Sequence, residues 1–387
     1  VQLQRLGHQV TLLSTMPYYP MGRVYPGYRG QVLVREELEG VPVIRVPSIP
    51  AANIGALRRV ASYLSFAASS ALYACLLPKP DLVIASVPHL GTELAALAAA
   101  RRFGCPSLLE LRDLFPDALA FVGISTSSRK ARALRCYMSA IYERFSLISA
   151  PSATMVAALA ARGVPADKLL LLPHGYDNDI LRPSSSPRAA RHTLGIGDRP
   201  LVLYLGSFSK YYDVPNMVRA ARLLERRSNA HLVLGGRGAD YHRVRLMIDG
   251  GRLNNVSLLG DVPRAQVAQY LGAADLCITS TVASDTPPSY HNYLATKACE
   301  YLGAGRQLIA IENAPVVGGA LHQHDIGRAV LGDAPASLAA AITTLLGDGG
   351  QQRRERNARS FARTHLDRRT IMRSFEAKLR CRLTGRI

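Results

Sequence analysis

Short runs of apolar residues alternate with segments of helical periodicity through the first half of the chain. Two of the helical segments cover residues 92–103 and 129–145. Continuous apolar strands that alternate with helices are typical of a parallel sheet covered on both faces. The predicted strands lie at residues 10–13, 43–46, 82–85, 107–111, 147–150 and 169–172.

A polar segment rich in Pro and Ser, at residues 182–187, interrupts this pattern. The alternation then starts again, with strands predicted at residues 201–205, 231–234, 256–259, 276–279, 307–311 and 328–331. Ligands bind open parallel sheets beyond the carboxyl ends of the strands, so two such domains place two sets of ends around one cleft. The expected organisation is an N-terminal domain at 1–182, a linker at 183–199, a C-terminal domain at 200–365 and a solvated closing helix at 366–387.

The beginning of the chain and its longest apolar stretch lead to two further expectations. Residues 1–6 have the pattern of the end of a helix and precede a strand, so we expect the first strand and its Gly-rich loop to be missing. Residues 60–77 are largely apolar but contain several Ser and Tyr hydroxyls. A membrane-spanning helix needs about 20 predominantly apolar residues, so a buried or interfacial helix is favoured over a transmembrane one.

The charge of the chain indicates an anionic partner. Lys and Arg number 47 against 28 Asp and Glu, a formal net charge of +19. Nucleic acid, acidic phospholipid and phosphate-bearing substrates all fit, but the chain has no zinc finger or RNA-recognition motif and few aromatic residues, which argues against nucleic acid. The six cysteines lie far apart without a C-x-x-C pair, which favours reduced, buried thiols in a cytosolic protein over a zinc or redox site.

The segment after the predicted strand 201–205 is a candidate phosphate site. It contains Gly206, Ser207 and Lys210 and precedes a predicted helix at 215–224. Free amides at a helix N-terminus bind phosphate, a lysine adds a point charge, and cations here would stabilise a leaving diphosphate. An ordinary strand–loop–helix turn with a surface lysine fits the segment equally well.

Gly236 and Arg237 lie in a glycine-rich turn at residues 235–238, directly after a predicted strand. A dinucleotide fingerprint would need a third glycine where this chain has Tyr241, which argues against a dehydrogenase. A tight strand-to-helix turn beside a nucleotide is the favoured interpretation.

Two pairs of charged residues are further candidates for the functional site. Lys297 and Glu300 are three residues apart and share one helical face, where the carboxylate could accept both hydroxyls of a ribose. The alternative is a surface ion pair between them. Arg112 and Asp113 follow the strand 107–111 at its carboxyl end and are expected to face the cleft, unless they form a salt-bridged loop.

A D-x-D sequence occurs at Asp177 and Asp179. Paired carboxylates can hold Mg²⁺ or Mn²⁺ beneath a pyrophosphate. This pair lies just after a strand and just before the linker, so a structural role is favoured over a metal site.

Taken in order, these segments resemble glycosyltransferase family 4, of GT-B fold, over nearly the full length. The similarity rests on LGHQVTLL at 6–13, YPGY at 25–28, ELRDLFP at 110–116, PHGYD at 173–177 and KACEYLGAG at 297–305. The strings YPGY and RDLFP look most like the subgroup that builds lipopolysaccharide O-antigen and capsular glycans.

The resemblance implies two Rossmann-like domains that face each other across a cleft. It also implies transfer of a sugar from a nucleotide diphosphate, with UDP as the favoured nucleotide and with retention of the anomeric configuration. It implies no cofactor and no metal, with the nucleotide-sugar as co-substrate. Residues 1–182 would bind a glycan or polyprenyl-diphosphate-linked acceptor, and residues 200–365 the donor. The residues assigned to catalysis are Arg112, Asp113 and Lys210, and those assigned to the donor are Gly206, Ser207, Gly236, Arg237, Lys297 and Glu300.

Three positions depart from the family pattern. Glu300 matches the second acid of the family's E-x7-E motif, which holds the ribose, but the first acid would fall at Asn292. The usual Arg of the pyrophosphate pair would fall near Ser207, which leaves Lys210 as the nearest cation. Arg112 replaces the acceptor-side His of many relatives. A nucleotide-sugar 2-epimerase of the same fold and a non-catalytic nucleotide-sugar-binding subunit are therefore alternatives.

Membrane attachment is expected through the N-terminal domain, where residues 60–77, which follow Arg58 and Arg59 and precede Lys79, offer a second apolar contact. The main candidate for the contact is the helix 129–145. Its apolar residues Leu134, Met138, Ile141 and Phe145 form one stripe, and four cations crowd its first two turns. A basic amphipathic helix can lie in an anionic lipid interface, although packing of the stripe on the sheet is the alternative. With a lipid-linked acceptor, this predicts a cytoplasmic protein, peripheral on the inner face of the cytoplasmic membrane.

Overall fold

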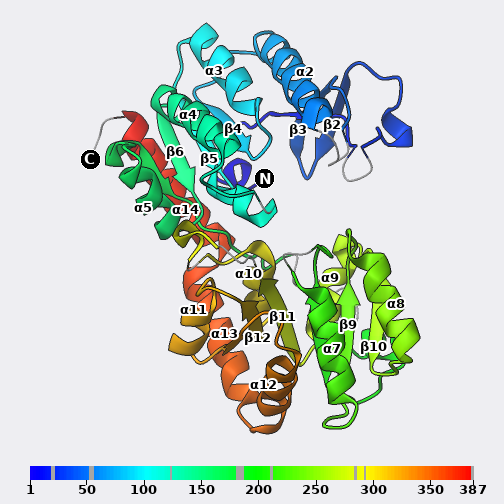
Figure 1. Cartoon of the computed structure of the whole chain (residues 1–387). Helices are drawn as coiled ribbons and strands as arrows, with labels where there is room; N and C mark the ends of the chain where they lie inside the picture. Colours follow the sequence, from blue (N-terminus) through cyan, green and yellow to red (C-terminus); the bar gives the residue numbers. More distant parts are fainter. Residues whose placement is uncertain are drawn as a thin grey trace. The chain divides into compact units, whose positions relative to one another are not determined.

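The computed structural model divides the chain into two compact α/β units (Figure 1). Both units contain parallel sheets, so the expected two-domain, parallel-sheet architecture is confirmed. Unit 1 comprises Val1–Ala118, Thr126–Leu172 and Met372–Ile387, and unit 2 comprises Leu119–Ser125 and Pro173–Ile371. The structure describes residues 1–18, 22–51, 56–122, 124–179, 187–209, 212–282, 286–291 and 293–384.

Unit 1 contains two sheets rather than one. A three-stranded sheet has the order β1-β3-β2, and a four-stranded parallel sheet has the order β4-β5-β6-β7. The antiparallel strand β2 was not predicted, because three of its five residues are charged. Its turn into β3 uses positive φ at Glu39 and Gly40, which suits the twist of a tight hairpin. The strands are β1 (Leu12–Thr15), β2 (Val34–Leu38), β3 (Val41–Val46), β4 (Val83–Val87), β5 (Ser107–Leu111), β6 (Leu147–Ala150) and β7 (Leu169–Leu171).

Two helices of unit 1, α4 and α5, begin at serine caps. Ser128 accepts a hydrogen bond from the Ala131 amide at the start of α4, and Ser152 accepts one from Met155 at the start of α5. The helices and short 3-10 turns are α1 (Gln2–Arg5), η1 (Pro26–Tyr28), α2 (Ala56–Ala74), α3 (Thr92–Phe103), η2 (Asp117–Val122), α4 (Arg129–Arg144), α5 (Ala153–Ala161), η3 (Ala166–Lys168) and α14 (Arg368–Thr384).

The closing helix expected at 366–387 is α14, which follows α13 (Gln351–His365), but it is not a solvated helix. From Met372 onward, α14 belongs to unit 1. Its Phe375 and Leu379 are buried against Leu108, Leu147 and Leu170 of the four-stranded sheet. The apolar residues of this basic helix therefore complete a core, which the high charge of the segment concealed.

The apolar stripe of α4 packs inward, so the lipid contact expected through it is wrong. Met138, Ile141 and Phe145 are buried, and Leu134 is partly buried. The four cations in the first two turns of α4 are exposed. This helix therefore offers charge, but no apolar face, to a partner.

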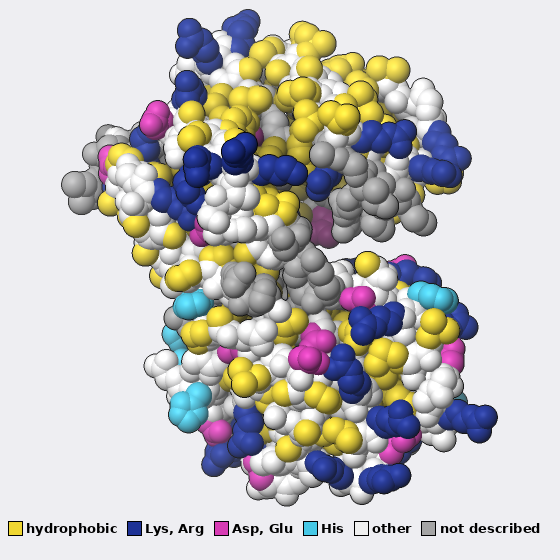
Figure 2. All heavy atoms as spheres, viewed as in Figure 1, with side chains coloured by type: hydrophobic (Ala, Val, Ile, Leu, Met, Phe, Trp, Pro, Cys, Tyr) yellow, Lys and Arg dark blue, Asp and Glu magenta, His cyan; other side chains and the backbone are white. Residues whose placement is uncertain are grey.

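Helix α2 shows the opposite arrangement, because several large apolar side chains lie on its outer face. Figure 2 shows apolar side chains gathered over the part of unit 1 where Figure 1 labels this helix. No helix within the described ranges is both long and apolar enough to cross a membrane.

Unit 2 is built on one six-stranded parallel sheet of order β10-β9-β8-β11-β12-β13. Alternate strand residues point to opposite faces, which gives two cores: α7, α8 and α12 cover one face, and α6, α9, α10, α11 and α13 cover the other. Its strands are β8 (Leu201–Leu205), β9 (His231–Gly235), β10 (Val256–Gly260), β11 (Leu276–Thr281), β12 (Gln307–Glu312) and β13 (Gly327–Val330). Its remaining helical elements are α6 (Pro187–Thr193), α7 (Val214–Leu224), α8 (Tyr241–Gly251), α9 (Arg264–Ala273), η4 (Pro288–Tyr290), α10 (Thr296–Gly303), α11 (Gly318–Gln323) and α12 (Pro335–Gly347).

The cysteines are free thiols in both units, as expected. Only Cys277 and Cys299 are buried, whereas Cys136 is exposed. Burial raises the pKa of the Cys277 and Cys299 thiols, so these two side chains behave as small apolar residues of the core.

Candidate functional site

The carboxyl ends of β8 and β9 form the floor of the candidate site in unit 2. The strands pair in register up to Leu205 and Gly235, so their ends are level. The Gly206 amide then donates a hydrogen bond to the Gly235 carbonyl (2.9 Å), and the Gly236 amide to the Gly260 carbonyl (2.6 Å). These bonds hold the backbone of the two predicted glycine turns side by side.

The glycine at position 236 is required by the close approach of the two turns. Its φ is +137°, and a Cβ at Gly236 would lie 1.8 Å from the Gly206 carbonyl oxygen. A Cβ at Gly238 would lie 2.3 Å from the Phe208 carbonyl oxygen. Any larger residue would push the loops apart, so these glycines keep bare backbone at the strand ends.

The second turn is fixed to the first and carries Arg237 outward. The Phe208 amide donates to the Arg237 carbonyl (2.8 Å), and the Asp240 amide donates to the Phe208 carbonyl (2.9 Å). The Arg237 side chain is exposed, pairs with Asp261 at 2.9 Å and lies over the Tyr241 ring. Arg237 is therefore positioned at the rim of the floor, beside the tyrosine that replaces the third glycine of a dinucleotide fingerprint.

Helix α10 is attached to the same floor through Tyr301. The buried Tyr301 hydroxyl accepts from the Leu205 amide and donates to the Leu205 carbonyl, both at 2.9 Å. This double contact fixes α10 relative to the end of β8. Lys297, one turn earlier on α10, is thereby brought to Gly206.

The Lys297 ammonium lies in an aromatic corner at this strand end. Its Nζ is 3.6 Å from the centre of the Tyr212 ring and 5.0 Å from that of Tyr204. A Cβ at Gly206 would lie 3.1 Å from the same Nζ. The fully buried Tyr204 donates its hydroxyl to the Ser207 carbonyl (2.8 Å), which orders the turn around the lysine.

The charge of Lys297 is not balanced by an acid. Within the described residues, no carboxylate forms an ion pair with it, and burial lowers the pKa of Lys297 to about 7. The faces of the two tyrosine rings stabilise the positive charge only in part. An anion bound beside Gly206 would therefore favour the protonated lysine and be bound by it.

Glu300 pairs with Arg264 and not with Lys297, which removes the predicted alternative of an ion pair within α10. Arg264 Nη1 donates to Glu300 Oε2 at 2.9 Å, and Nη2 donates to Oε1 at 2.6 Å. Glu300 is buried, whereas the Arg264 side chain is about half exposed. The hydrogen bonds that Arg264 donates to this carboxylate raise the pKa of the guanidinium. Each carboxylate oxygen still has room for one further donor.

The residues predicted for the acceptor lie in unit 1, after β5. The Arg112 amide donates to the Val87 carbonyl at the end of β4 (3.1 Å), while its side chain is exposed. Asp113, next in the chain, is partly buried. The following loop is held by Arg162, which pairs with Asp117 at 2.6 Å. Arg112 and Asp113 are thus at a carboxyl strand end, as the sequence predicted.

Other predicted residues have varied positions. Lys210 and Asn292 lie outside the described residues. Ser207 is exposed beside Gly206. Asp179 of the D-x-D sequence forms an ion pair with Arg369, and the Asp179 amide donates to Asp177 Oδ1 (3.1 Å). In the part of the chain that the structure describes, no cluster of His, Cys, Asp or Glu is arranged to hold a metal ion.

Several residues of this region were not predicted. Arg264, Tyr204 and Tyr212 carry no motif of their own, and only the fold brings them to α10. Glu312, at the end of β12, accepts hydrogen bonds from the Val317 amide (2.8 Å) and the Gly318 amide (2.9 Å), and burial raises its pKa. This carboxylate occupies the start of α11, so those amides are already satisfied.

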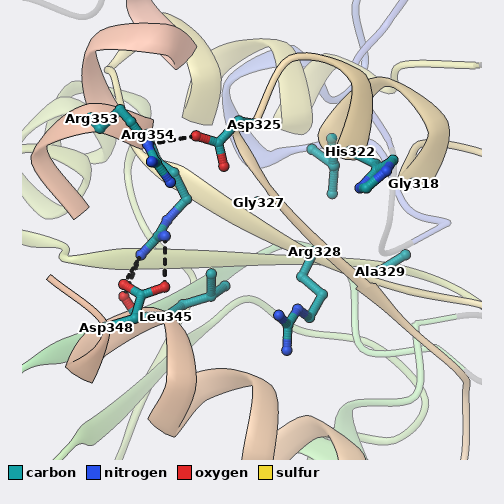
Figure 3. A pocket seen from close by; sticks show the side chains of 11 residues that line it. Gly318, His322, Asp325, Gly327, Arg328, Ala329, Leu345, Asp348, Arg353 and Arg354 are labelled. Atoms are coloured by element: carbon teal, nitrogen blue, oxygen red, sulfur yellow. Dashed lines mark hydrogen bonds and ion pairs between the residues drawn. The ribbon is translucent and has the colours of Figure 1, made fainter. Parts of the chain in front are cut away.

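A pocket of about 440 Å³ lies elsewhere in unit 2 and contains none of the predicted site residues (Figure 3). Arg354 and Arg353 point into it, but they pair with Asp348 (2.7 Å) and Asp325 (2.7 Å). The charges of these arginines are therefore already neutralised. We assign no function to this pocket.

Comparison with known proteins gives the class of the chain. The family model described as Glycosyl transferase 4-like domain matches residues 1–175, and that described as Glycosyl transferases group 1 matches residues 188–362. WcaI of Escherichia coli (strain K12), which bears the name colanic acid biosynthesis glycosyl transferase, is 24% identical over 388 residues. This alignment covers 95% of the chain and 91% of WcaI.

Solved structures agree on the fold. Sucrose-phosphate synthase from Thermosynechococcus elongatus has a TM-score of 0.76 at 19% identity, covering 99% of this chain and 91% of that one. HepE of Anabaena, in complex with UDP and glucose, has a TM-score of 0.70 at 17% identity, covering 96% and 99%. The protein is thus a sugar-transferring enzyme of GT-B fold. It belongs to glycosyltransferase family 4.

Proposed function

We propose that this glycosyltransferase moves a sugar from a UDP-sugar onto a glycan or polyprenyl-diphosphate-linked acceptor of cell-surface polysaccharide synthesis. The transfer retains the anomeric configuration of the sugar and needs no metal ion. The proposal for UDP is supported by HepE, which was solved with UDP and glucose. The proposal for the pathway class is supported by WcaI, whose name refers to colanic acid biosynthesis.

The observation that carries the proposal is the partly buried Lys297, whose ammonium lies beside Gly206. A nucleoside diphosphate bound at the end of β8 would place its phosphates against this cation and the bare glycine backbone. When the sugar leaves, negative charge builds up on the diphosphate, and a positioned cation lowers the barrier. Lys297, together with Lys210, which follows Ser207 in the sequence, supplies the positive charge that a metal ion provides in other enzymes.

The other predicted residues have roles around this anion. Glu300 accepts ribose hydroxyls while Arg264 holds its carboxylate in place, and Arg237 lies beside the base. Arg112 and Asp113 of unit 1 orient the acceptor hydroxyl. The departing phosphate takes the acceptor proton, so that no separate base is needed.

Calorimetric titration with UDP, without added metal, tests this proposal. Replacing Lys297 by Met keeps the apolar part of the side chain but removes its charge, and should weaken UDP binding by about ten- to a hundredfold. Lys378 is exposed on α14 and offers a matched charge-removing control. If Lys297→Met binds UDP as tightly as Lys378→Met, the diphosphate does not bind at this corner.

We propose further that the enzyme is cytoplasmic and peripheral on the inner face of the cytoplasmic membrane. A polyprenyl-linked acceptor resides in a membrane, and the net charge of +19 favours an anionic surface. Since the stripe of α4 is buried, this attachment requires an apolar contact from another element.

A further inference from the structure

Helix α2 carries a series of large apolar side chains on the outside of unit 1, although its Phe66 is buried on the inner side. The exposed residues follow one another at spacings of three or four, so they form one stripe along the helix. The stripe continues into the turn after the helix, and the first residue in it is 88% exposed. Its members are Leu57, Val60, Leu64, Ala68, Leu72 and Leu76.

Serine hydroxyls of α2 lie on its inner face, together with the buried Phe66 and Ala67. Ser62 and Ser70 are buried there, and Ser69 donates its hydroxyl to the Pro47 carbonyl (2.7 Å). Ser65 accepts from the Ile49 amide (2.9 Å), which keeps the exposed Ile49 beside the outer stripe. The hydroxyls that argued against a spanning helix therefore lie inward, and the outer stripe remains apolar.

Positive charge surrounds the stripe. Arg58 and Arg59 lie at the start of α2, Lys79 follows its end, and residues 56–79 contain no acid. Unit 1 as a whole carries 23 Lys and Arg against 11 Asp and Glu, a formal charge of +12. Figure 2 shows Lys and Arg side chains along the margins of the apolar patch. An apolar stripe with a cationic border matches the interface of an anionic bilayer.

We propose that α2 lies in the plane of an anionic membrane, with its leucine stripe in the acyl boundary and the flanking cations at the headgroups. The proposal rests on the proposed membrane-linked acceptor, and it assigns the contact to α2 instead of α4. The exposed cations of α4 add charge without inserting. A second copy of the chain fits less well, because a symmetric dimer through α2 would bring two units of +12 together.

The absence of tryptophan from the chain provides a direct probe of insertion. Leu64→Trp places one fluorophore on the stripe, and Leu246→Trp places one on α8 of unit 2. The two leucines are equally exposed, at 57% each. Vesicles of phosphatidylglycerol and phosphatidylcholine should shift the emission of Leu64→Trp to the blue and leave Leu246→Trp unchanged. Vesicles of phosphatidylcholine alone should shift neither.

A charge-neutral double variant tests whether the stripe contributes affinity. Leu64→Ser with Leu72→Ser should lower partitioning onto anionic vesicles by at least about tenfold, since two apolar side chains no longer insert. The control, Leu246→Ser with Leu331→Ser, removes leucines of comparable exposure from unit 2 and should change nothing. Both double variants should bind UDP as tightly as the unmodified protein does. A loss of vesicle binding without a loss of UDP binding therefore tests the membrane contact independently of the proposed donor site.

Three results would overturn the proposal. The protein could fail to sediment with anionic vesicles at low salt. It could bind vesicles while Leu64→Trp emission stays constant. The Leu64→Ser and Leu72→Ser variant could change the molecular mass in solution and leave vesicle binding intact, in which case the stripe is an interface between copies.

Discussion

Arg264 holds the carboxylate of Glu300 with two hydrogen bonds, one to each oxygen. The two residues come from different helices, α9 and α10, and both elements begin at the side of unit 2 where the candidate donor site lies. The bidentate pair fixes the carboxylate plane in the absence of a ligand. The carboxylate of Glu300 is therefore already oriented for the ribose contact that we propose.

Replacing Glu300 by Gln should lower nucleotide affinity about ten- to a hundredfold while the fold stays intact. The change keeps the shape of the side chain but removes the charge, and hydrogen bonds to a charged partner contribute roughly 1.5–3 kcal/mol. Calorimetry with UDP, compared with the same titration using uracil, measures the part of the loss that belongs to the ribose and phosphates.

The matching variant Arg264→Gln tests whether Glu300 acts on the ligand or only on Arg264. If Glu300 contacts the ribose, adding Glu300→Gln to Arg264→Gln should still cost affinity. Should Arg264→Gln alone abolish the effect of Glu300→Gln, the role of Glu300 is confined to holding Arg264.

Nucleotide affinity should fall as the pH rises above 7. Burial lowers the pKa of Lys297 to about 7, so the free enzyme loses this positive charge just where the diphosphate is fully ionised. Each pH unit above 7 should weaken UDP binding by up to about tenfold, until the pKa of Lys297 in the complex is reached. Lys297→Arg keeps its charge and should show a flat profile between pH 7 and 9. Identical affinities for the unmodified enzyme across that range would remove Lys297 from the phosphate site.

The stability of the protein should respond to pH through Lys297 in the opposite sense to UDP affinity, because a rise in pH should increase the free energy of unfolding. Between pH 7 and about 10.5 the unfolded chain binds a proton at Lys297 that the folded protein lacks. The contribution of Lys297 to the free energy of unfolding should therefore increase as the pH rises from 7 to about 10.5. Urea unfolding of the unmodified protein and Lys297→Met at pH 7 and pH 9 measures this difference, which should grow in favour of the unmodified protein at pH 9.

Sugar transfer should proceed in EDTA. Asp179 already pairs with Arg369, and Lys297 provides charge at the proposed phosphate site. Asp179→Asn should leave transfer unchanged, apart from a small loss of stability from an exposed ion pair. Loss of activity in EDTA that Mg²⁺ or Mn²⁺ restores would identify Asp177 and Asp179 as metal ligands.

Gly236→Ala should destabilise unit 2 by about 3 kcal/mol or more, because the new methyl group would lie 1.8 Å from the Gly206 carbonyl oxygen. Gly197 also has positive φ, but a Cβ there would meet no other atom within 4 Å, so Gly197→Ala should cost only about 1 kcal/mol of backbone strain. Urea unfolding compares the two. Equal effects would mean that the loops at β8 and β9 do not approach as closely as described.

The alternation of apolar and helical segments predicted most of the fold, because buried parallel strands are short apolar runs between polar turns. The run 201–205 was predicted with the bounds that β8 has, between Pro200 and Gly206. Strand β2 was missed because its charged residues are tolerated in a hairpin of a small sheet. The inward packing of α14 and the outward stripe of α2 depend on what lies next to each helix, which periodicity alone does not reveal.

The candidate site was predictable only where backbone geometry requires a particular residue. Gly236 was found because a tight turn after a strand needs glycine. Glu300 was found by its motif, but its partner Arg264 is 36 residues earlier and has no signal of its own. The alternative of an ion pair between Lys297 and Glu300 is excluded, because Lys297 lies against the Tyr212 ring and Glu300 pairs with Arg264.

The most direct test of the account is transfer from a radiolabelled UDP-sugar to a membrane extract containing polyprenyl-linked acceptors, in EDTA. The donor is chosen as the nucleotide-sugar that raises the melting temperature most in a panel. We expect label in the lipid phase, UDP released in equal amount, and an anomeric configuration in the product that matches the donor. Label that stays on the nucleotide as an epimer would indicate a 2-epimerase. Tight binding with no label moved, in the presence of every acceptor extract, would contradict the assignment of this chain as an active transferase.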